Sequence, residues 1–394
     1  MTRLFDRGPK AAPQSLYVHV PFCTDRCTYC AFATMADRPA LHRDLVDALL
    51  LEYGRRPALE AGMETVYFGG GTPGLLAPGL LERLLNGLQA RSRLETGAEI
   101  TLEVNPTNVS KDALSAWSEL GITRLSIGIQ TFDDAVLAGF GRHHDGDLGR
   151  AALDLIAEHW KGLWSADLLV GFKDQTSQDL TFDLAQLLKR SAPHISVYGL
   201  TIEPGTQLHE QARRGSVVRL EDTYMDSYDI LWSSYLHGFG YERYEVSNFA
   251  LPEARSRHNQ AYWRNEDYLG IGPGASSSRH PLRWSNLRDT KQYLEQISGN
   301  RDTRHHVERL QPSDRLLESL GVGLRTRDGV DIDELERRFG DSWRIALAAG
   351  IQQLKQQRLL EEVDNNLRIP ATALTRADSI AAVFARTMEL PPSQ

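Results

Sequence analysis

Short, β-branched apolar segments alternate with amphipathic helical patterns through the first 200 residues, and this alternation constrains the fold more than any other feature. Six segments are predicted strands: Leu16–Val20, Thr65–Phe68, Glu99–Val104, Arg124–Ile129, Trp164–Val170 and Ile195–Leu200. Helical patterns separate them near residues 40–55, 78–90, 110–120, 147–160 and 178–190. Near-continuously apolar strands separated by helices are typical of βα units with a parallel sheet. Six units are too few to close an eight-stranded barrel, so we expect an α/β fold with an open, partial (β/α)6 TIM-like barrel.

The pattern changes after about residue 215. A helix is predicted near 220–237, and an irregular region rich in aromatic residues and glycine follows to about residue 287. Three helices, near 312–324, 331–339 and 342–356, then precede a hairpin formed by Leu359–Val363 and Leu367–Pro370. We therefore divide the chain into an N-terminal tail (1–14), the partial barrel (15–215), a connecting region (216–305) and a mostly helical, winged-helix-like C-terminal domain (306–394). We interpret this last domain as a packing or interaction module.

Charge and the ends of the chain limit the compartment and the partners. The chain carries 44 Lys and Arg against 52 Asp and Glu, a net charge of −8. This acidic balance argues against nucleic acid as a partner, because nucleic-acid binders usually present a basic face. The first residues contain no apolar run of a secretory signal, and no stretch approaches the roughly 20 apolar residues of a membrane span. We expect a cytoplasmic protein, where thiols stay reduced.

All three cysteines of the chain lie within eight residues. Cys23, Cys27 and Cys30 have the spacing C-x3-C-x2-C and follow the first predicted strand. Three thiolates on one short loop can hold three irons of a cubane cluster and leave the fourth iron open to a substrate. The alternative is a zinc site, completed by His19 or by a more distant histidine.

Polar or glycine-rich residues recur where the other predicted strands end. The run from Gly69 to Pro73 reads GGGTP after the second strand. Glu103 ends the third strand, Gln130 the fourth and Thr201 the sixth, while Asp167 lies within the fifth. Because the carboxyl ends of parallel strands meet at one edge of the sheet, we expect these groups to gather there.

The cysteine spacing after strand 1, the GGGTP run after strand 2 and the partial barrel together resemble the radical S-adenosylmethionine (SAM) superfamily. The closer resemblance is to the family of the oxygen-independent coproporphyrinogen III dehydrogenase HemN and its heme-chaperone branch. The matching segments are Tyr17–Phe32, Tyr67–Pro73, Glu103–Pro106, Ser126–Phe132, Gly141–His143, Asp167–Gly171, Ser196–Thr206, Tyr244–Phe249, His258–Trp263 and Tyr268–Ala275. They follow in the expected order over about 260 residues.

The resemblance implies a 4Fe-4S cluster on the three cysteines, with SAM chelating the open iron. Gly70, Gly71 and Thr72 match positions that meet the methionine part of SAM. By the same resemblance, Glu103 lies near the SAM amino group, Arg142 near its carboxylate, and Gln130 and Asp167 near its ribose, while Tyr17 and Thr201 make further contacts. Glycines in such a cradle let the backbone approach a zwitterion closely.

Two departures from the family pattern bear on the branch and on one loop. Lys173-Asp174 stand where the family usually has Pro-Gly. Phe32 stands where the dehydrogenase usually has a fourth cysteine, and only 22 residues precede Cys23, whereas the dehydrogenase usually has a longer leading segment. Phe32 and the short leader favour the heme-chaperone branch.

The run from His258 to Trp263 reads HNQAYW and resembles the heme-associated motif of that branch. Imidazole binds iron and flat rings pack on a porphyrin, so His258 is a candidate heme ligand; a packed aromatic cluster around a hydrogen-bonded histidine is the alternative. The resemblance implies a chaperone that delivers heme to a hemoprotein acceptor, with a homodimer and peripheral membrane association. The alternatives are the dehydrogenase, which oxidatively decarboxylates coproporphyrinogen III through a 5′-deoxyadenosyl radical, another radical SAM enzyme acting on a tetrapyrrole, and a zinc protein without SAM.

Overall fold

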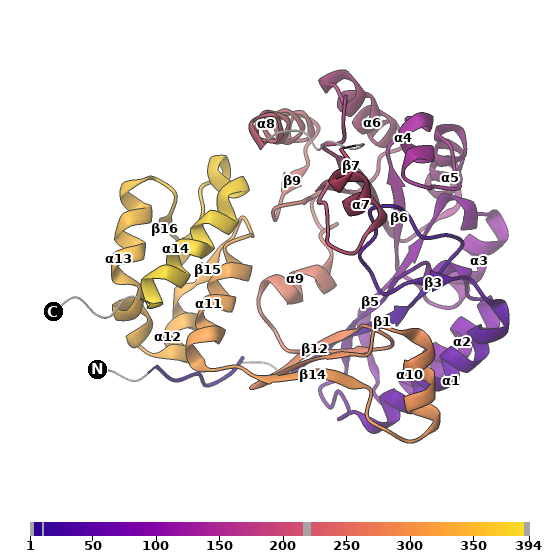
Figure 1. Cartoon of the computed structure of the whole chain (residues 1–394), viewed down its shortest axis with the longest axis horizontal. Helices are drawn as coiled ribbons and strands as arrows, with labels where there is room; N and C mark the ends of the chain where they lie inside the picture. The colour runs from indigo at the N-terminus through magenta and orange to yellow at the C-terminus, as the bar shows by residue number, and fades with distance from the viewer. Residues whose placement is uncertain (1–3, 10–11, 216–221, 390–394) are drawn as a thin grey trace.

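A computed structural model describes residues 4–9, 12–215 and 222–389, and its core is an open barrel of parallel strands (Figure 1). Six parallel strands lie side by side in chain order: β1 (Ser15–Val20), β4 (Met63–Gly70), β5 (Leu94–Val104), β6 (Arg124–Gln130), β7 (Leu163–Val170) and β8 (His194–Gly199). The expected α/β class and six-stranded partial barrel are confirmed. The structure does not describe residues 1–3, 10–11, 216–221 and 390–394. The first two residues of the helix predicted near 220–237 therefore lie outside the described residues.

The helices between the strands cover the outer face of the sheet. They are α1 (Pro39–Arg55), α2 (Pro78–Gln89), α3 (Lys111–Glu119), α4 (Asp134–Gly139), α5 (Gly146–His159) and α6 (Ser177–Lys189), with short 3-10 turns η1 (Pro73–Leu75) and η2 (Pro106–Asn108). Helix α6 shows which local features make these segments helical. The hydroxyl of Thr176 accepts from the N–H of Asp179 at the N-terminus, and Leu180, Leu184 and Leu187 repeat at helical spacing and are buried. Each buried leucine contributes roughly 1.5–3 kcal/mol to stability.

The strands alternate between apolar and polar residues, which corrects the expectation of near-continuously apolar strands. Leu125, Ile127 and Ile129 of β6 belong to the apolar core under the helices, whereas the intervening Arg124 and Ser126 line a cavity inside the barrel. Neighbouring strands add further polar residues to this lining: Thr101, Ser165, His194 and Ser196. Side chains in a strand point alternately to the two faces of the sheet, so the barrel interior is polar instead of a packed apolar core.

The region expected to be irregular instead extends the sheet at both ends. Strands β10 (Asn248–Ala250) and β9 (Glu242–Arg243) continue from β8. On the other side, β11 (Tyr268–Ile271) pairs in parallel with β1 and is followed by β12 (Ser276–Arg279), β13 (Leu282–Asn286) and β14 (Arg304–Arg309). Helices α7 (Gln207–Arg213), α8 (Asp222–Gly238), α9 (Arg257–Trp263) and α10 (Thr290–Ser298) complete this part. The short strands were hard to predict because glycines and polar residues interrupt their patterns.

A separate apolar core forms the C-terminal domain, which lies beside the barrel in Figure 1. Its elements are α11 (Pro312–Gly323), β15 (Val330–Asp331), α12 (Ile332–Phe339), α13 (Ser342–Gln356), β16 (Glu361–Val363), β17 (Asn366–Arg368), η3 (Ala371–Arg376) and α14 (Ala377–Glu389). The three strands form a small sheet in the order β15-β17-β16. The N-terminal segment binds this domain, since Asp6 accepts two hydrogen bonds from the guanidinium of Arg338, both at 3.1 Å. No helix among the described residues is long and apolar enough to cross a membrane.

Candidate functional site

The cysteine loop leaves β1 at the carboxyl edge of the barrel. Cys23 lies in the short strand β2 (Phe22–Cys23), which pairs with β3 (Met35–Ala36) and closes the base of the loop. Two backbone hydrogen bonds anchor the middle of the loop: the N–H of Thr28 donates to Phe140 O at 3.0 Å, and Thr28 O accepts from the N–H of Leu208 at 2.8 Å. The loop is therefore held by the ends of the βα units on the far side of the barrel mouth.

The three thiols lie together at the wall of one cavity. All three cysteines are free and half-buried, and no three His, Cys, Asp or Glu side chains among the described residues form a group that could hold one metal ion. A single zinc ion would draw thiolates together at about 2.3 Å from the metal, whereas a cubane spreads its ligands over several irons. Burial and the neighbouring thiol of Cys30 raise the pKa of Cys23 to about 12. A thiol held protonated in this way needs a cationic group to become a thiolate, and a bound iron or zinc ion would provide that charge.

The GGGTP run forms a tight cradle against the base of the cysteine loop. Gly70 adopts φ +112°, and a Cβ on Gly71 would lie 2.5 Å from Phe22 O, which no real side chain tolerates. The N–H of Thr72 donates to Phe22 O at 2.7 Å. Glycine is thus required at these two positions for the backbone path itself, and the same path brings main-chain groups to the cavity wall.

Glu103 lies in the wall of the cavity, and hydrogen bonds hold both of its carboxylate oxygens. Oε1 accepts from the hydroxyl of Tyr67 at 2.8 Å, and Oε2 accepts from the N–H of Gly70 at 2.9 Å. Burial, with a contribution from Asp167, raises the pKa of Glu103 to about 7. A carboxyl poised this way gains its negative charge readily when a cationic or amino group approaches.

Asp167 and Arg142 lie on other walls of the same cavity. Asp167 accepts from the hydroxyl of Ser126 at 3.0 Å, and burial raises its pKa. Arg142 donates to Asn105 Oδ1 at 2.9 Å and to the carbonyl of Gly128 at 2.6 Å, and its Nη1 lies 3.6 Å from the Cys27 sulfur. The guanidinium therefore places a fixed positive charge beside the cysteine loop.

The structure brings most of the predicted site residues to one cavity of about 360 Å³. Ten of them line it: Cys23, Cys27, Cys30, Gly70, Gly71, Thr72, Glu103, Gln130, Arg142 and Asp167. Gln130 has φ +71° at an irregularity in the register between β6 and β7, so its backbone turns at the cavity rim. Phe32, which stands where the dehydrogenase usually has a fourth cysteine, also lines the cavity and is 65% exposed.

Three predicted residues do not line this cavity. Tyr17 lies behind it, where its hydroxyl contacts His19 Nδ1 at 3.0 Å and its ring stacks on Tyr67. Thr201 is exposed beyond the end of β8 and donates to Gly199 O at 3.4 Å. His258 is 1% exposed, with Nδ1 2.7 Å from Thr65 Oγ1 and Nε2 2.9 Å from the Tyr262 hydroxyl. In this structure both ring nitrogens of His258 are engaged within the protein.

Asn105 is a site residue to which the sequence motif alone assigned no role. Its Nδ2 donates to Thr72 Oγ1 at 2.9 Å, while its Oδ1 accepts from Arg142. The side chain thus joins the glycine cradle to the cation beside Cys27. Its position directly after Glu103-Val104 at a strand end was the available signal.

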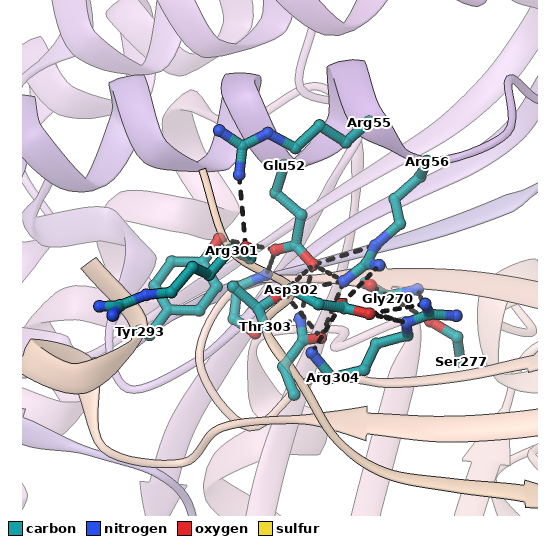
Figure 2. Close-up of polar contacts among 12 residues, drawn as sticks. Glu52, Arg55, Arg56, Gly270, Ser277, Tyr293, Arg301, Asp302, Thr303 and Arg304 are labelled. Atoms are coloured by element: carbon teal, nitrogen blue, oxygen red, sulfur yellow. Dashed lines mark hydrogen bonds and ion pairs between the residues drawn. The ribbon is translucent and has the colours of Figure 1, made fainter. Parts of the chain in front are cut away.

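A buried carboxylate positions the back of the cysteine loop. Figure 2 shows Glu52 of α1 among polar groups of the sheet extension. The Glu52 carboxylate accepts from the hydroxyl of Tyr293 at 2.6 Å, from Asn286 Nδ2 at 2.8 Å and from the N–H of Gly272 at 2.9 Å. The turn that begins at Gly272 continues to Gly274, where a Cβ would lie 2.6 Å from the Ala33 side chain. The network therefore holds this turn against the end of the cysteine loop.

Comparison with known proteins identifies the family. A model of the radical SAM superfamily matches residues 17–186, and a model of the HemN C-terminal domain matches residues 310–374. The heme chaperone HemW of Lactococcus lactis is 34% identical over 352 residues, which cover 88% of this chain and 91% of that protein. The chain belongs to the HemW family. This confirms the resemblance drawn from the motifs.

Other HemW relatives and one solved structure agree with this assignment. Heme chaperone HemW of Escherichia coli is 37% identical over 68% of this chain and 70% of that protein. Radical S-adenosyl methionine domain-containing protein 1, mitochondrial, of Bos taurus is 34% identical over 84% of this chain and 72% of that protein. The coproporphyrinogen III oxidase HemN of Escherichia coli has the same fold, with a TM-score of 0.79 and 22% identity over 95% of this chain and 90% of that one. The radical SAM domain supports SAM and a 4Fe-4S cluster as cofactors of this HemW family member.

Proposed function

We propose that this chain binds a 4Fe-4S cluster, SAM and heme, and delivers the heme to a client hemoprotein. The observation that carries the proposal is the 34% identity to a protein named heme chaperone over nine-tenths of that protein's length. Phe32 supports the same branch, because the thiol that the dehydrogenase usually has at this position is absent.

Cys23, Cys27 and Cys30 would hold the cluster, which supplies one-electron chemistry and an open iron for SAM. The residues around it would orient SAM. The backbone of the Gly70–Thr72 cradle would meet the methionine part, Glu103 would accept from the amino group, and Arg142 would pair with the carboxylate. Gln130 and Asp167 would contact the ribose, at the rim and on the wall of the same cavity.

A second cavity, of about 720 Å³, is our proposed place for heme. It lies between α9 and the C-terminal domain, and its lining includes Trp263, Arg255, Arg264 and Arg337. An indole supplies a flat apolar surface for a porphyrin. The arginines can pair with the two carboxylates of heme if they exchange their present partners, such as Glu242 at 3.0 Å from Arg255 and Glu334 at 2.6 Å from Arg337. Helix α9 separates the two cavities, since Asn259 lines the barrel cavity and Trp263 lines this one.

The test is an anaerobic assay on the reconstituted protein. SAM and reductant are supplied with either heme or coproporphyrinogen III, and the products are analysed together with the heme absorbance spectrum. We expect stoichiometric heme binding, weakened by Trp263→Ala, and no decarboxylation. Formation of protoporphyrinogen IX would overturn the chaperone assignment in favour of the dehydrogenase.

Delivery, assembly and location are separate parts of the proposal. A heme-acceptor protein, a homodimer and peripheral membrane association are proposed from the family resemblance, and a cytoplasmic location is proposed from the sequence, which contains no secretory signal pattern. Heme transfer is tested by mixing the heme-loaded protein with an apo-hemoprotein and following the acceptor's absorbance. Sedimentation tests the dimer, and flotation with anionic vesicles tests membrane association. Retention of heme by the protein in the presence of every acceptor tried, including respiratory hemoproteins, would contradict delivery.

A further inference from the structure

The amino-terminal end of the barrel, opposite the cysteine loop, carries polar residues to which no SAM contact is assigned. Arg124 begins β6 and His194 begins β8, and both line the barrel cavity although each is only 2% exposed. Thr101 of β5 pairs in register with Arg124 and also lines the cavity. We propose that these three residues form a binding site for the carboxylate of a small organic acid, beneath SAM and separate from the cavity assigned to heme.

Each of the three residues has a buried polar atom without a hydrogen-bond partner among the described residues. These atoms are Nη1 of Arg124, Nδ1 of His194 and Oγ1 of Thr101. Their side chains point into the barrel, because the next residue along each strand belongs to the apolar core under the helices. Buried polar groups in proteins are almost always paired with protein, water or a ligand. Three such atoms around one cavity therefore indicate a place for a ligand rich in oxygen.

The guanidinium of Arg124 supplies the positive charge of this site. Its Nη2 donates to the carbonyl of Ala254 at 3.0 Å, which fixes its orientation. Its Nη1 lies 3.7 Å from Glu99 Oε2, beyond hydrogen-bond distance. The Glu99 carboxylate itself accepts three shorter hydrogen bonds, of 3.0 to 3.2 Å, from the first residues of α9. Nη1 therefore keeps an N–H that a second carboxylate can accept.

His194 and Thr101 add neutral donors beside this charge. Burial and the charge of Arg124 lower the pKa of His194 well below its ordinary value, so the ring is neutral. Its Nε2 lies 2.8 Å from the hydroxyl of Tyr244. When that hydroxyl donates to Nε2, the single ring proton lies on Nδ1 and is available to an acceptor. One cation and two neutral donors suit a carboxylate, whereas Arg124 would repel a cationic ligand.

The position of the site limits the size of its ligand. Glu103 pairs with Ser126 in the register of β5 and β6, whereas Thr101 pairs with Arg124 two residues earlier. Two residues of a strand span about 7 Å, so the carboxylate would lie about that far below Glu103. The cavity of about 360 Å³ also includes the surroundings of the residues assigned to SAM. The room that remains beneath SAM therefore fits a short-chain acid and excludes a tetrapyrrole.

The experiment is a calorimetric titration of the reconstituted full chain with butyrate, and butyramide serves as the neutral probe of the same size. Titrations are carried out with and without SAM. The variants are Arg124→Gln and Thr101→Val, and the control is Arg309→Gln, which replaces an exposed arginine of β14. Valine keeps the branched shape of threonine and lacks the hydroxyl. Thermal unfolding of each variant establishes that it is folded.

We expect saturable binding of butyrate to the wild type and to Arg309→Gln, and at least tenfold weaker binding of butyramide. Arg124→Gln should weaken butyrate binding about tenfold or more, the effect of losing a hydrogen bond between charged groups. Thr101→Val should weaken it about threefold to tenfold without lowering the Tm, because the hydroxyl has no partner within the described part of the chain. A purely structural role of Thr101 would leave butyrate affinity unchanged.

Three results would overturn the proposal. The first is the absence of saturable butyrate binding to the wild type, both with and without SAM. The second is equal affinity for butyrate and butyramide, or wild-type butyrate affinity in Arg124→Gln. The third is displacement of butyrate by coproporphyrinogen III, which would assign the site to a tetrapyrrole side chain. If Arg124→Gln does not fold, Thr101→Val decides, since unchanged butyrate affinity in that variant refutes the site. Heme takes no part in these titrations, so failure of the proposed chaperone function would leave them intact.

Discussion

Replacing Glu103 with glutamine separates the effect of this carboxyl on the stability of the folded protein from its effect on SAM affinity. Burial raises the pKa of the Glu103 carboxyl in the folded protein from its ordinary value of 4.5 to about 7. As the pH rises between these values, the unfolded chain loses this proton first, so the folded state becomes less stable. A shift of this size corresponds to at most about 3 kcal/mol above pH 7, and water in the cavity reduces that figure.

Glu103→Gln removes the titration but keeps the size of the side chain. We therefore expect the stability of the variant relative to wild type to rise by about 1 to 3 kcal/mol between about pH 5 and pH 8, in the absence of SAM. SAM affinity should fall tenfold to about a hundredfold, since the amide cannot replace a charge-assisted acceptor. The wild-type affinity should increase with pH up to about 7, where Glu103 becomes ionised.

The assay is urea unfolding at several pH values, combined with SAM titration of the reconstituted protein. Glu60→Gln is the matched control, because Glu60 is exposed before β4 and should show neither effect. A stability difference between Glu103→Gln and wild type that stays constant with pH would refute the reasoning, because it would mean that the carboxyl is already ionised at pH 5. Unchanged SAM affinity would separately refute the assignment of Glu103 to SAM.

Three further predictions concern the loop, the cradle and the network behind them. Cys27→Ser should lower iron and sulfide from about four per chain to near zero in chemical analysis, and a full cluster in this variant would contradict the ligand set. Gly71→Ala should cost about 1 to 3 kcal/mol in urea unfolding and weaken SAM binding, because its Cβ meets backbone at 2.5 Å, whereas Gly79→Ala, with open space around it, should be harmless. Glu52→Ala should cost about 3 to 5 kcal/mol, since the Arg56 guanidinium loses its buried carboxylate and keeps only neutral partners and the half-exposed Asp302; a loss below about 1 kcal/mol would show that the network is dispensable.

Local patterns were enough to predict the elements that form through nearby contacts. The cysteine spacing, the GGGTP run and the strand–helix alternation each depend on residues close in sequence, and the structure places Cys23, Gly71 and Glu103 around one cavity. The parallel sheet explains this success, because every βα unit presents its carboxyl end at the same edge.

The missed features depend on partners far along the chain. Strand β11 is only four residues long and exists as a strand because β1 offers it an edge, about 250 residues earlier in sequence. The alternation of Arg124 and Ser126 with apolar residues is visible in the sequence. The sequence does not show, however, whether the inner face of the barrel is packed or lines a cavity.

The sequence by itself determined the family, the grouping of the three cysteines on one loop and the six-unit barrel, because these follow from local spacing and from the order of motifs. Only the tertiary structure decided the surroundings of individual side chains. It turned His258 towards Thr65 and Tyr67, left Thr201 exposed, and gave Asn105 contacts with both the glycine cradle and Arg142. The physical reason is that a hydrogen bond or a stacked ring depends on distances in space, which a one-dimensional pattern does not contain.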